Sequence, residues 1–531
     1  MRRLIIATVL LLAATVLVTV VYFRHLNTTS QHANLVMRTI PNDASLIFEF
    51  NNEKEFYDIF TGNNLFKNIL GEEKQEELNA LRNVLLQNPM TAKYFNGQNI
   101  FISLHPQKGN SIDFLLTTSV SIEFQDNILE QLAKQPKSGM LITPIDIGGK
   151  PGYVIYLNDL KKRFYLINKE DHSLSGSFSK DIITNCANYD YRREKESFVL
   201  LPDQQRSNSL ANLYINYQAL TPLVEQLFLN KNYDIFRNFR QFPAFAALSL
   251  NFKSDALVFN GSSLVQNNQR DSYVELFSGQ QPIVNKLKEI FPSTTAYCTN
   301  FAVSDPAKFE SDLSEWQSKS DFNTEKNKIL KKVKTETGIS IQKEFSRLLG
   351  GEFAMVTTHY HEKIAIVQVS DGSRLLAMLT NISKMNGDNT GQFNYEKLPQ
   401  ILLGEAFSTF KRPYFKVIDN YLILTNSASE LISYNDSYTN RKFLVRTEGY
   451  NEFNNLTAER CNIFFFIQFK NALQLFRQDM KSPFYESFNA LNPGWKNFYG
   501  ASWQLSSTDK SFYTDFCIRL NSDTTSVKNN F

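Results

Sequence analysis

Two histidines in one short segment are the residues in this chain best suited to bind a metal ion. His359 and His361 flank Tyr360 and are followed by Glu362. In a strand, alternate side chains point to one face, so two such imidazoles can chelate one ion together with a carboxylate from elsewhere. The alternative is a polar hairpin turn, and we favour it because the sequence offers no evident third ligand. His359 and His361 are therefore the candidate metal ligands, and we expect no cofactor.

The patterns that accompany nucleophilic catalysis are incomplete. Ser177 to Lys180 fits the S-x-x-K pattern of penicillin-binding enzymes, and so does Ser507 to Lys510 in a predicted hairpin turn. The companion S-D-N and K-T-G motifs are absent, as are G-x-S-x-G, the Walker phosphate loop, G-x-G-x-x-G and H-E-x-x-H. The sequence names no catalytic residue and favours a protein that is not an enzyme, with a hydrolase lacking a recognisable motif as one alternative.

A lysine-rich segment at residues 323–338 is predicted to be an amphipathic helix. Its apolar positions are Ile329, Leu330 and Val333, and Glu325 and Glu336 dilute its charge. Its basic positions are Lys326, Lys328, Lys331, Lys332 and Lys334. A helix of this kind can lie on an anionic membrane surface, but a solvated basic face is the interpretation we favour.

Composition limits the class of protein. The chain has 531 residues and a net charge of +3, a balance that argues against nucleic-acid binding. It contains 44 Phe and 23 Tyr, which is typical of aromatic-rich strands and also compatible with a groove for an apolar ligand. The four cysteines lie in or beside apolar segments, so we expect buried free thiols. The alternative is one disulfide, most plausibly between Cys298 and Cys517.

The N-terminus predicts a membrane anchor. An uncharged apolar run extends from Leu4 to Phe23, between Arg2-Arg3 and Arg24. Twenty helical residues span roughly 30 Å, the thickness of the hydrocarbon core of a bilayer. The positive start keeps residues 1–3 in the cytoplasm and places the bulk of the chain on the other side, which in bacteria is the periplasm. A cleaved signal peptide is the alternative, although its apolar run would be shorter and end in small residues.

In the remainder of the chain, one order of short motifs, predicted strands and helices recurs after 251 to 254 residues. Pro41 precedes a predicted strand and a helix, and Pro292 precedes the same pair. Matching segments follow in the same order: strands 100–104 and 112–119 with 353–357 and 364–369, strands 164–168 and 173–177 with 415–418 and 421–425, and hairpins 245–264 with 499–520. The order predicts an internal duplication.

The predicted fold class is α+β, because hairpins mix with helices and no regular βαβ alternation is present. We expect two tandem copies of a mixed helix and antiparallel-sheet unit behind an N-terminal transmembrane helix. The expected boundaries are a cytoplasmic start at 1–3, an anchor at 4–23, a stalk at 24–38, repeats at 39–264 and 282–520, a linker at 265–281 and a polar tail at 521–531.

Two short motifs carry a family resemblance. One is the Pro-Asn-Asp-Ala or Pro-Ser-Thr-Thr sequence before a strand, and the other is Leu-Gly-Gly-Glu-Phe-Ala at 349–354. Together with the predicted anchor, the chain resembles an uncharacterised family of membrane-anchored extracytoplasmic bacterial proteins with a domain of unknown function. The resemblance implies an address and an architecture, and it supplies no catalytic residues.

The function expected from the sequence is that of a single-pass, extracytoplasmic binding or scaffold protein of the cell envelope. Its partners would be the membrane, through the N-terminal helix, and an envelope protein, with no nucleic acid. The second hypothesis is a carrier of a lipid or other apolar ligand next to the membrane, which the aromatic content motivates.

Overall fold

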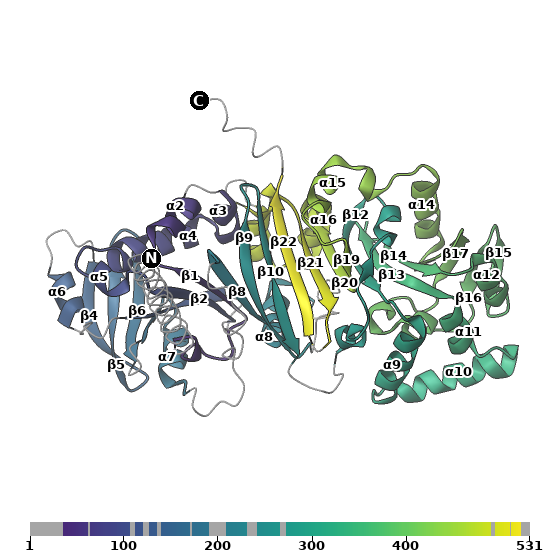
Figure 1. Ribbon diagram of the computed structural model, residues 1–531, viewed down its shortest axis with the longest axis horizontal. Coiled ribbons are helices and arrows are strands. Elements are labelled where there is room, and N and C mark those ends of the chain that lie inside the picture. Colours follow the sequence, from purple (N-terminus) through teal and green to yellow (C-terminus); the bar gives the residue numbers. More distant parts are fainter. Residues whose placement is uncertain are drawn as a thin grey trace, which may run out of the picture. The chain divides into compact units, whose positions relative to one another are not determined.

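The chain folds into two compact units in a computed structural model (Figure 1). The structure describes residues 36–61, 64–106, 112–120, 127–134, 140–169, 173–190, 209–230, 242–265, 272–489, 494–509 and 511–521. The predicted anchor, most of the predicted stalk and nearly all of the predicted tail lie outside these ranges. Within them, no helix is long and apolar enough to cross a membrane. The first unit comprises the described residues up to 61 and 73–215, and the second comprises 64–72 and 216–521.

The first unit is built on one antiparallel sheet. Its strands are β1 (Leu46–Asn51), β2 (Asn99–Pro106), β3 (Ile112–Ser119), β4 (Met140–Ile147), β5 (Lys150–Leu157), β6 (Lys162–Lys169), β7 (Ser173–Ser177) and β8 (Ala211–Asn216). The strand pairings give the order β8-β1-β2-β3-β7-β6-β5-β4. The central strands of this order are β3 and β7, and the edge strand β8 pairs with β1, which lies far from it in sequence.

Short helices accompany the first sheet. They are α2 (Lys54–Thr61), α4 (Glu72–Leu81) with the π-helical turn η1 (Arg82–Leu86), α5 (Ala92–Phe95), α6 (Asn127–Ala133) and α7 (Lys180–Asn188). Helix α7 begins at Ser179, whose hydroxyl accepts a hydrogen bond from the backbone N–H of Ile182. Ile182, Ile183 and Cys186 lie on one side of α7, and they pack on Leu115 and other buried residues of the sheet.

The second unit contains a longer antiparallel sheet. Its strands are β9 (Ala244–Phe252), β10 (Ala256–Val265), β12 (Thr295–Ala302), β13 (Leu349–Thr358), β14 (Lys363–Val369), β15 (Ser383–Gly387), β16 (Thr390–Phe393), β17 (Tyr414–Ile418), β18 (Tyr421–Thr425), β20 (Ile463–Gln468), β21 (Phe498–Ser507) and β22 (Ser511–Leu520). The pairings give the order β9-β10-β22-β21-β20-β12-β13-β14-β18-β17-β16-β15. Two short strands, β11 (Ile283–Val284) and β19 (Arg460–Cys461), pair with each other.

The helices of the second unit connect these strands. They are α3 (Asn64–Leu70), α8 (Tyr217–Leu227), α9 (Pro306–Ser318), α10 (Asn323–Thr337), α11 (Ile341–Leu348), α12 (Gly372–Thr380), α13 (Leu398–Leu403), α14 (Ala428–Thr439), α15 (Glu448–Asn454), α16 (Phe469–Asp479) and α17 (Ser482–Asn489), with the 3₁₀ turns η6 (Tyr273–Phe277), η7 (Leu287–Ile290), η8 (Glu405–Phe407), η9 (Leu444–Arg446) and η10 (Trp495–Asn497). Asp305 caps α9 ahead of Pro306, and Ser427 forms a capping box with Glu430 at the start of α14, as the sequence predicts.

Aromatic residues form the centre of the second unit. Phe353 on β13 lies within 5.2 to 6.3 Å, between ring centroids, of Phe277, Phe301, Phe309 and Phe407, and all five side chains are fully buried. The high Phe content therefore fills a core here, as the first interpretation of the composition holds.

The mixed α+β class is confirmed, and most of the predicted strands lie within a residue or two of the observed ones. The hairpins β4–β5 and β15–β16 are absent from the sequence analysis. The compact units also do not coincide with the predicted repeats, because β9 and β10 belong to the second unit. β10 pairs with β22 along nine positions, from Ala256 opposite Arg519 to Leu264 opposite Ser511.

Candidate functional site

The two candidate metal ligands lie in a turn rather than in a strand. β13 ends at Thr358, and the N–H of His361 donates to the Thr358 carbonyl at 3.0 Å in the turn to β14. His361 has a φ of 67°, in the left-handed region that tight turns use. The side-chain alternation of a strand therefore does not apply to them, as the hairpin alternative predicts. Among the described residues, no group of three or more His, Cys, Asp or Glu side chains is arranged to hold a metal ion.

The S-x-x-K pattern at 177–180 has a structural explanation. Ser177 is fully buried on β7 and donates its hydroxyl to the Phe114 carbonyl at 2.7 Å, whereas Lys180 is exposed at the start of α7. Ser179 caps that helix. A nucleophile and its base must be in hydrogen-bond contact, and these two residues are not paired. The second such pattern ends at Lys510, which lies outside the described residues.

A Ser-His-Asp arrangement that the sequence analysis missed lies in the first unit. The Nε2 atom of His105 lies 2.9 Å from the Ser103 hydroxyl, and its Nδ1 atom lies 2.8 Å from Asp43 Oδ1. Ser103 and His105 are alternate residues of β2, so they point to the same face, and Asp43 precedes β1, the neighbour of β2. The pattern Ser-x-His on a strand is the signal that was available in the sequence.

Burial prevents this arrangement from acting on a substrate. Ser103 is 0% exposed and His105 is 1% exposed, so a carbonyl group has no route to the hydroxyl. The Ser103 hydroxyl also lies 3.3 Å from the Leu115 carbonyl, to which it can donate. A serine nucleophile needs an accessible hydroxyl and an oxyanion site beside it. These hydrogen bonds instead tie the segment before β1 to the end of β2.

We expect His105→Ala to lower the free energy of unfolding of the first unit by about 2 kcal/mol, since it removes a buried side chain and two hydrogen bonds. Ser103→Ala should cost about 1 kcal/mol. Urea unfolding followed by circular dichroism measures both. The native protein should also resist a fluorophosphonate probe, and covalent labelling that disappears in Ser103→Ala would show that the hydroxyl is a working nucleophile.

Each unit contains a buried carboxylate that is bonded to an amide on the adjacent strand. In the first unit, Glu49 of β1 accepts hydrogen bonds from Asn99 of β2 at 2.8 Å and from Tyr214 of β8 at 2.6 Å. Asn212 donates a third, at 3.1 Å. Burial raises the pKa of Glu49, and the three hydrogen bonds reduce that effect.

In the second unit the carboxylate belongs to Glu352 of β13, and the amide of Asn300 on β12 donates to it at 2.8 Å. The backbone N–H groups of Lys286 and Leu287, at the start of η7, donate to the same carboxylate at 2.8 and 3.2 Å. Burial raises the pKa of Glu352 as well. Both carboxylates are 3% exposed and bonded within the protein, so they position strands and loops rather than offering an open acid or base.

Asp515 is the carboxylate with the clearest response to pH. It lies opposite Asn260 in the pairing of β22 with β10, and burial raises its pKa from 3.8 to about 6 while a hydrogen bond from Asn260 opposes the shift. A raised pKa in the folded state means that folding favours the protonated form. The contribution of Asp515 to the free energy of unfolding therefore falls as the pH rises from about 4 to about 6.

We expect Asp515→Asn to remove this loss. Above pH 6 the variant should be more stable than the wild type by about 1 to 2 kcal/mol, because no charge is then held in a mostly buried position, and below pH 4 the two should be equal. Thermal unfolding across pH 4 to 8 measures the difference. Equal stability of the two proteins at every pH would refute the raised pKa.

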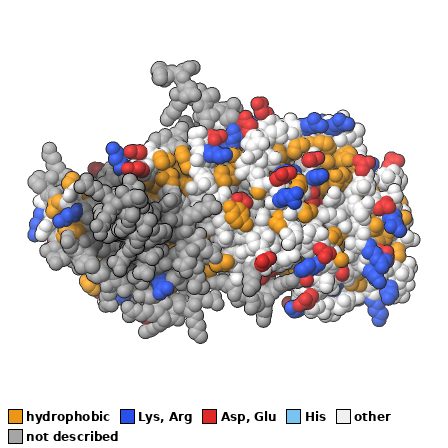
Figure 2. Space-filling view, in the orientation of Figure 1, with side chains coloured by type: hydrophobic (Ala, Val, Ile, Leu, Met, Phe, Trp, Pro, Cys, Tyr) orange, Lys and Arg blue, Asp and Glu red, His pale blue; other side chains and the backbone are white. Residues whose placement is uncertain are grey.

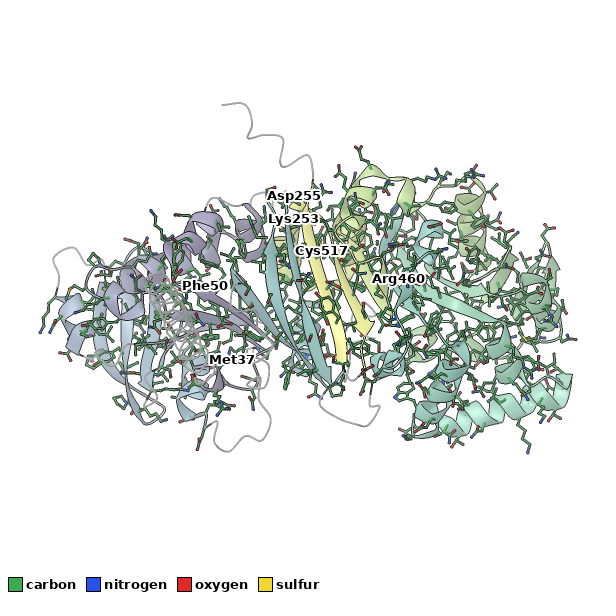
Figure 3. The ribbon with its side chains drawn as sticks, viewed as in Figure 1. Met37, Phe50, Lys253, Asp255, Arg460 and Cys517 are labelled. Carbon is green, nitrogen blue, oxygen red and sulfur yellow. The ribbon has the colours of Figure 1, made fainter. Side chains whose placement is uncertain are left out.

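The cysteines are all buried and free. Cys517 lies on β22 (Figure 3), and the pairings place Cys298, Phe466, Ser502 and Cys517 in one row across four adjacent strands. Three strand spacings separate Cys298 from Cys517 by about 14 Å, whereas a disulfide needs Cα atoms about 4.4 to 6.8 Å apart. The disulfide considered between them is therefore wrong. Burial raises the pKa of Cys461 and of Cys517 to about 12, which keeps both as unreactive thiols.

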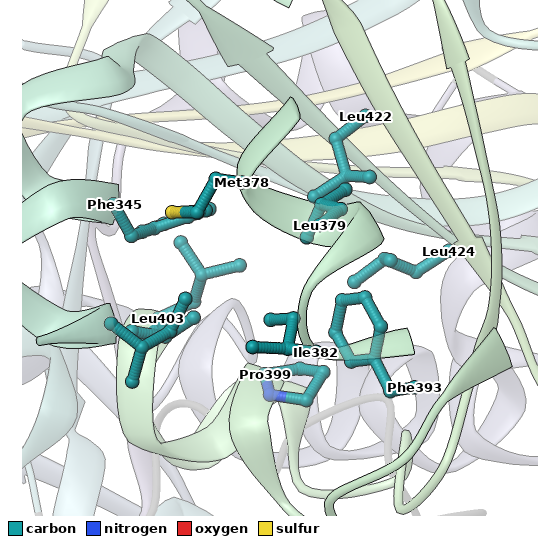
Figure 4. A pocket seen from close by; sticks show the side chains of 11 residues that line it. Phe345, Met378, Leu379, Ile382, Phe393, Pro399, Leu403, Leu422 and Leu424 are labelled. Atoms are coloured by element: carbon teal, nitrogen blue, oxygen red, sulfur yellow. The ribbon is translucent and has the colours of Figure 1, made fainter. Parts of the chain in front are cut away.

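An apolar cavity lies in the second unit, under helices α11, α12 and α13 (Figure 4). Its volume is about 10 Å³, which is room for about one water molecule. It is lined by Ile341, Phe345, Met378, Leu379, Ile382, Phe393, Pro399, Leu402, Leu403, Leu422 and Leu424. This cavity is a packing gap, and it does not accommodate the acyl chain that the lipid-carrier hypothesis requires.

Five side chains considered above are thus buried, and each is hydrogen-bonded within the protein: Ser103, His105, Ser177, Glu49 and Glu352. Residue types and spacing pointed to His359, His361 and the S-x-x-K serines, whereas the structure draws attention to Ser103, Glu49 and Glu352. A comparison of the chain with protein-family models, with curated proteins and with solved structures gives no match.

Proposed function

We propose that this protein is a membrane-anchored, extracytoplasmic binding or scaffold protein of the cell envelope, without catalytic activity. The anchor is the apolar run 4–23 behind Arg2 and Arg3, and the bulk of the chain lies in the periplasm. Membership of the uncharacterised family that the chain resembles belongs to the same proposal. The two described units would then present their surfaces to another envelope component.

The observation that carries this proposal is the burial of the serine hydroxyls, the histidine and the two carboxylates considered above as candidate nucleophiles, bases or acids. Ser103, His105 and Ser177 are at most 1% exposed, and Glu49 and Glu352 are 3% exposed. Such groups stabilise a fold, and they cannot reach a substrate without unfolding it. A protein whose chemistry is internal acts through its surface, which supports binding over catalysis.

We also propose that the chain arose by duplication of one α+β unit. The order β4-β5-β6-β7-β3-β2-β1-β8 in the first unit has the same sequence of connections as β15-β16-β17-β18-β14-β13-β12-β20 in the second. Eight strands that pair in one order, with first residues 240 to 252 positions apart in the sequence, are hard to obtain from unrelated units.

The two carboxylate–amide pairs support the duplication further. Glu49 is followed 251 residues later by Asn300, and Asn99 is followed 253 residues later by Glu352. The two pairs join β1 with β2 and β12 with β13 at the same register, so the acid and the amide have exchanged strands while the hydrogen bond is kept at 2.8 Å.

The sheet edges indicate which part of the surface is open to a partner. β4 pairs only with β5 among the described residues, and it carries Pro144, which lacks a backbone donor. β15 pairs with β16 through a bulge between Met385 and Gly387. Proline and bulges block strand addition at an edge, so we expect a partner to bind at faces and loops.

Site-directed photo-crosslinking in intact cells tests the proposal. Ile432, Tyr360 and Leu229 are 70%, 66% and 66% exposed, and a photoreactive amino acid at each reports on contacts of that surface. We expect a discrete product with an envelope component at one or more of these positions, and carbonate extraction should leave the chain in the membrane. Release of the chain by carbonate would refute the predicted anchor. The absence of crosslinked products at all three positions would count against the binding function.

A further inference from the structure

Helix α10 presents a row of lysines to the solvent. Lys328, Lys331, Lys332 and Lys334 are all exposed, and we call them the lysine face. The spacing places them on about half of the helix circumference, because successive residues are about 100° apart. Figure 2 shows Lys and Arg side chains gathered at the end of the second unit where α10 lies.

The opposite side of α10 is used for packing within the unit. Val333 is fully buried, and Ile329 and Leu330 are half-buried. Lys326 turns inward, where its ammonium lies 3.5 Å from the Ser314 carbonyl and burial lowers its pKa. The apolar residues therefore dock the helix on the protein and are not available to insert into a membrane.

The acidic residues of α10 are already engaged. Glu325 accepts two hydrogen bonds from Lys397 at 2.7 Å, and Glu336 accepts one from the Tyr395 hydroxyl at 2.7 Å. Lys332 lies 3.9 Å from Glu336, a distant pair with both side chains at least half exposed. Glu325 is thus balanced by Lys397, whereas Glu336 keeps its negative charge beside Lys332, and the positive charge of the lysine face comes mainly from Lys328, Lys331 and Lys334.

We propose that the lysine face of α10 binds the anionic headgroups of a lipid bilayer. Four cations on a rigid, exposed arc complement a surface of negative charge, and the docked apolar side limits the contact to electrostatics. The binding is reversible and weakens with salt, since screening shortens the reach of each charge. In the cell, this contact requires that the chain lie near a membrane, which rests on the proposed anchor. The exposure of the four lysines does not depend on the anchor.

The test uses the full chain in nanodiscs of phosphatidylcholine, which satisfy the proposed anchor, mixed with vesicles of equal parts phosphatidylglycerol and phosphatidylcholine. We expect the chain to float with these vesicles at low salt and not with pure phosphatidylcholine vesicles. The variant K328Q/K331Q/K332Q/K334Q should bind up to about a thousandfold more weakly, since each lysine near an anionic surface contributes about 1 kcal/mol. If the chain purifies without detergent, the proposed anchor is wrong, and the same flotation is run without nanodiscs. Failure of the anchor and failure of lipid binding by the lysine face are therefore measured separately.

A matched variant controls for total charge. Lys253, Lys384, Lys411 and Lys470 are exposed residues of the same unit outside α10, and K253Q/K384Q/K411Q/K470Q has the same net charge as the test variant. We expect it to retain at least half of the binding. Equal losses in the two variants, or no flotation of the wild type, would overturn the proposal. So would binding of the wild type to polyphosphate but not to the vesicles, which would identify a soluble polyanion as the ligand.

Discussion

We expect Phe353→Ala to lower the free energy of unfolding of the second unit by about 4 kcal/mol. Phe353 is 0% exposed, and its ring contacts Phe277, Phe301, Phe309 and Phe407 at centroid distances of 5.2 to 6.3 Å. Removing it leaves a cavity among rigid aromatic rings that cannot collapse without leaving their rotamers. Urea unfolding measured by tryptophan fluorescence reports the change, since Trp316 and Trp503 lie in this unit.

Two further variants separate the cavity from a general effect of mutation. Phe353→Leu keeps most of the volume and should cost about half as much. Tyr360→Ala, only seven residues away, removes an aromatic side chain that is 66% exposed and should change the stability by less than about 0.5 kcal/mol. A similar loss in Phe353→Ala and Tyr360→Ala would show that the aromatic cluster does not stabilise the unit.

Glu352→Ala should lower the stability of the same unit by about 3 kcal/mol at neutral pH. The carboxylate accepts hydrogen bonds from the Asn300 amide and from the backbone of Lys286 and Leu287. Without it, three donors lose their acceptor, and the two that are buried, from Asn300 and Leu287, each cost about 1 to 3 kcal/mol, less whatever relaxation or water recovers. Amide hydrogen exchange should report the loss locally, as faster exchange at Lys286 and Leu287.

Glu352→Gln is the informative companion. The glutamine keeps one acceptor oxygen but presents an NH₂ group to the remaining donors. We therefore expect a free energy of unfolding between that of the wild type and that of Glu352→Ala. Asn300→Ala removes only one of the donors and should cost about 1 kcal/mol. If Glu352→Gln proved more stable than the wild type at neutral pH, desolvation of the charge would outweigh its hydrogen bonds, consistent with the raised pKa of Glu352.

Glu352 and Phe353 both belong to the segment 349–354, on which the family resemblance rests, and the structure gives that segment a structural role. Leu349 pairs with Val369 and Phe353 pairs with Val367, so Gly350 and Gly351 form a bulge in β13. A Cβ atom at Gly350 would lie 2.9 Å from the Gln368 carbonyl oxygen, which explains the glycine there. The motif thus bulges β13, accepts hydrogen bonds from the start of η7 through Glu352 and places Phe353 in the aromatic core.

The sequence by itself determined the local elements of this protein. Short, continuous runs of apolar residues specify β3 and β14, and the cap at Asp305 with Pro306 specifies the start of α9, because these signals depend only on near neighbours. The order of the segments also carried the α+β class. The hairpin β15–β16 was missed because β15 is short and polar, and the hairpin β4–β5 was missed because β4, although mostly apolar, carries Pro144 and is largely exposed.

Only the tertiary structure decided which residues meet. Asp43 and His105 are 62 residues apart in sequence, and Glu49 and Tyr214 are 165 residues apart, so no local sequence pattern predicts their hydrogen bonds. The same holds for the pairing of β10 with β22, which brings the β9–β10 hairpin into the second unit. Contacts between distant segments depend on the order in which strands pair around a core, and this order decides which polar groups are buried and which, like the lysine face of α10, are exposed to solvent.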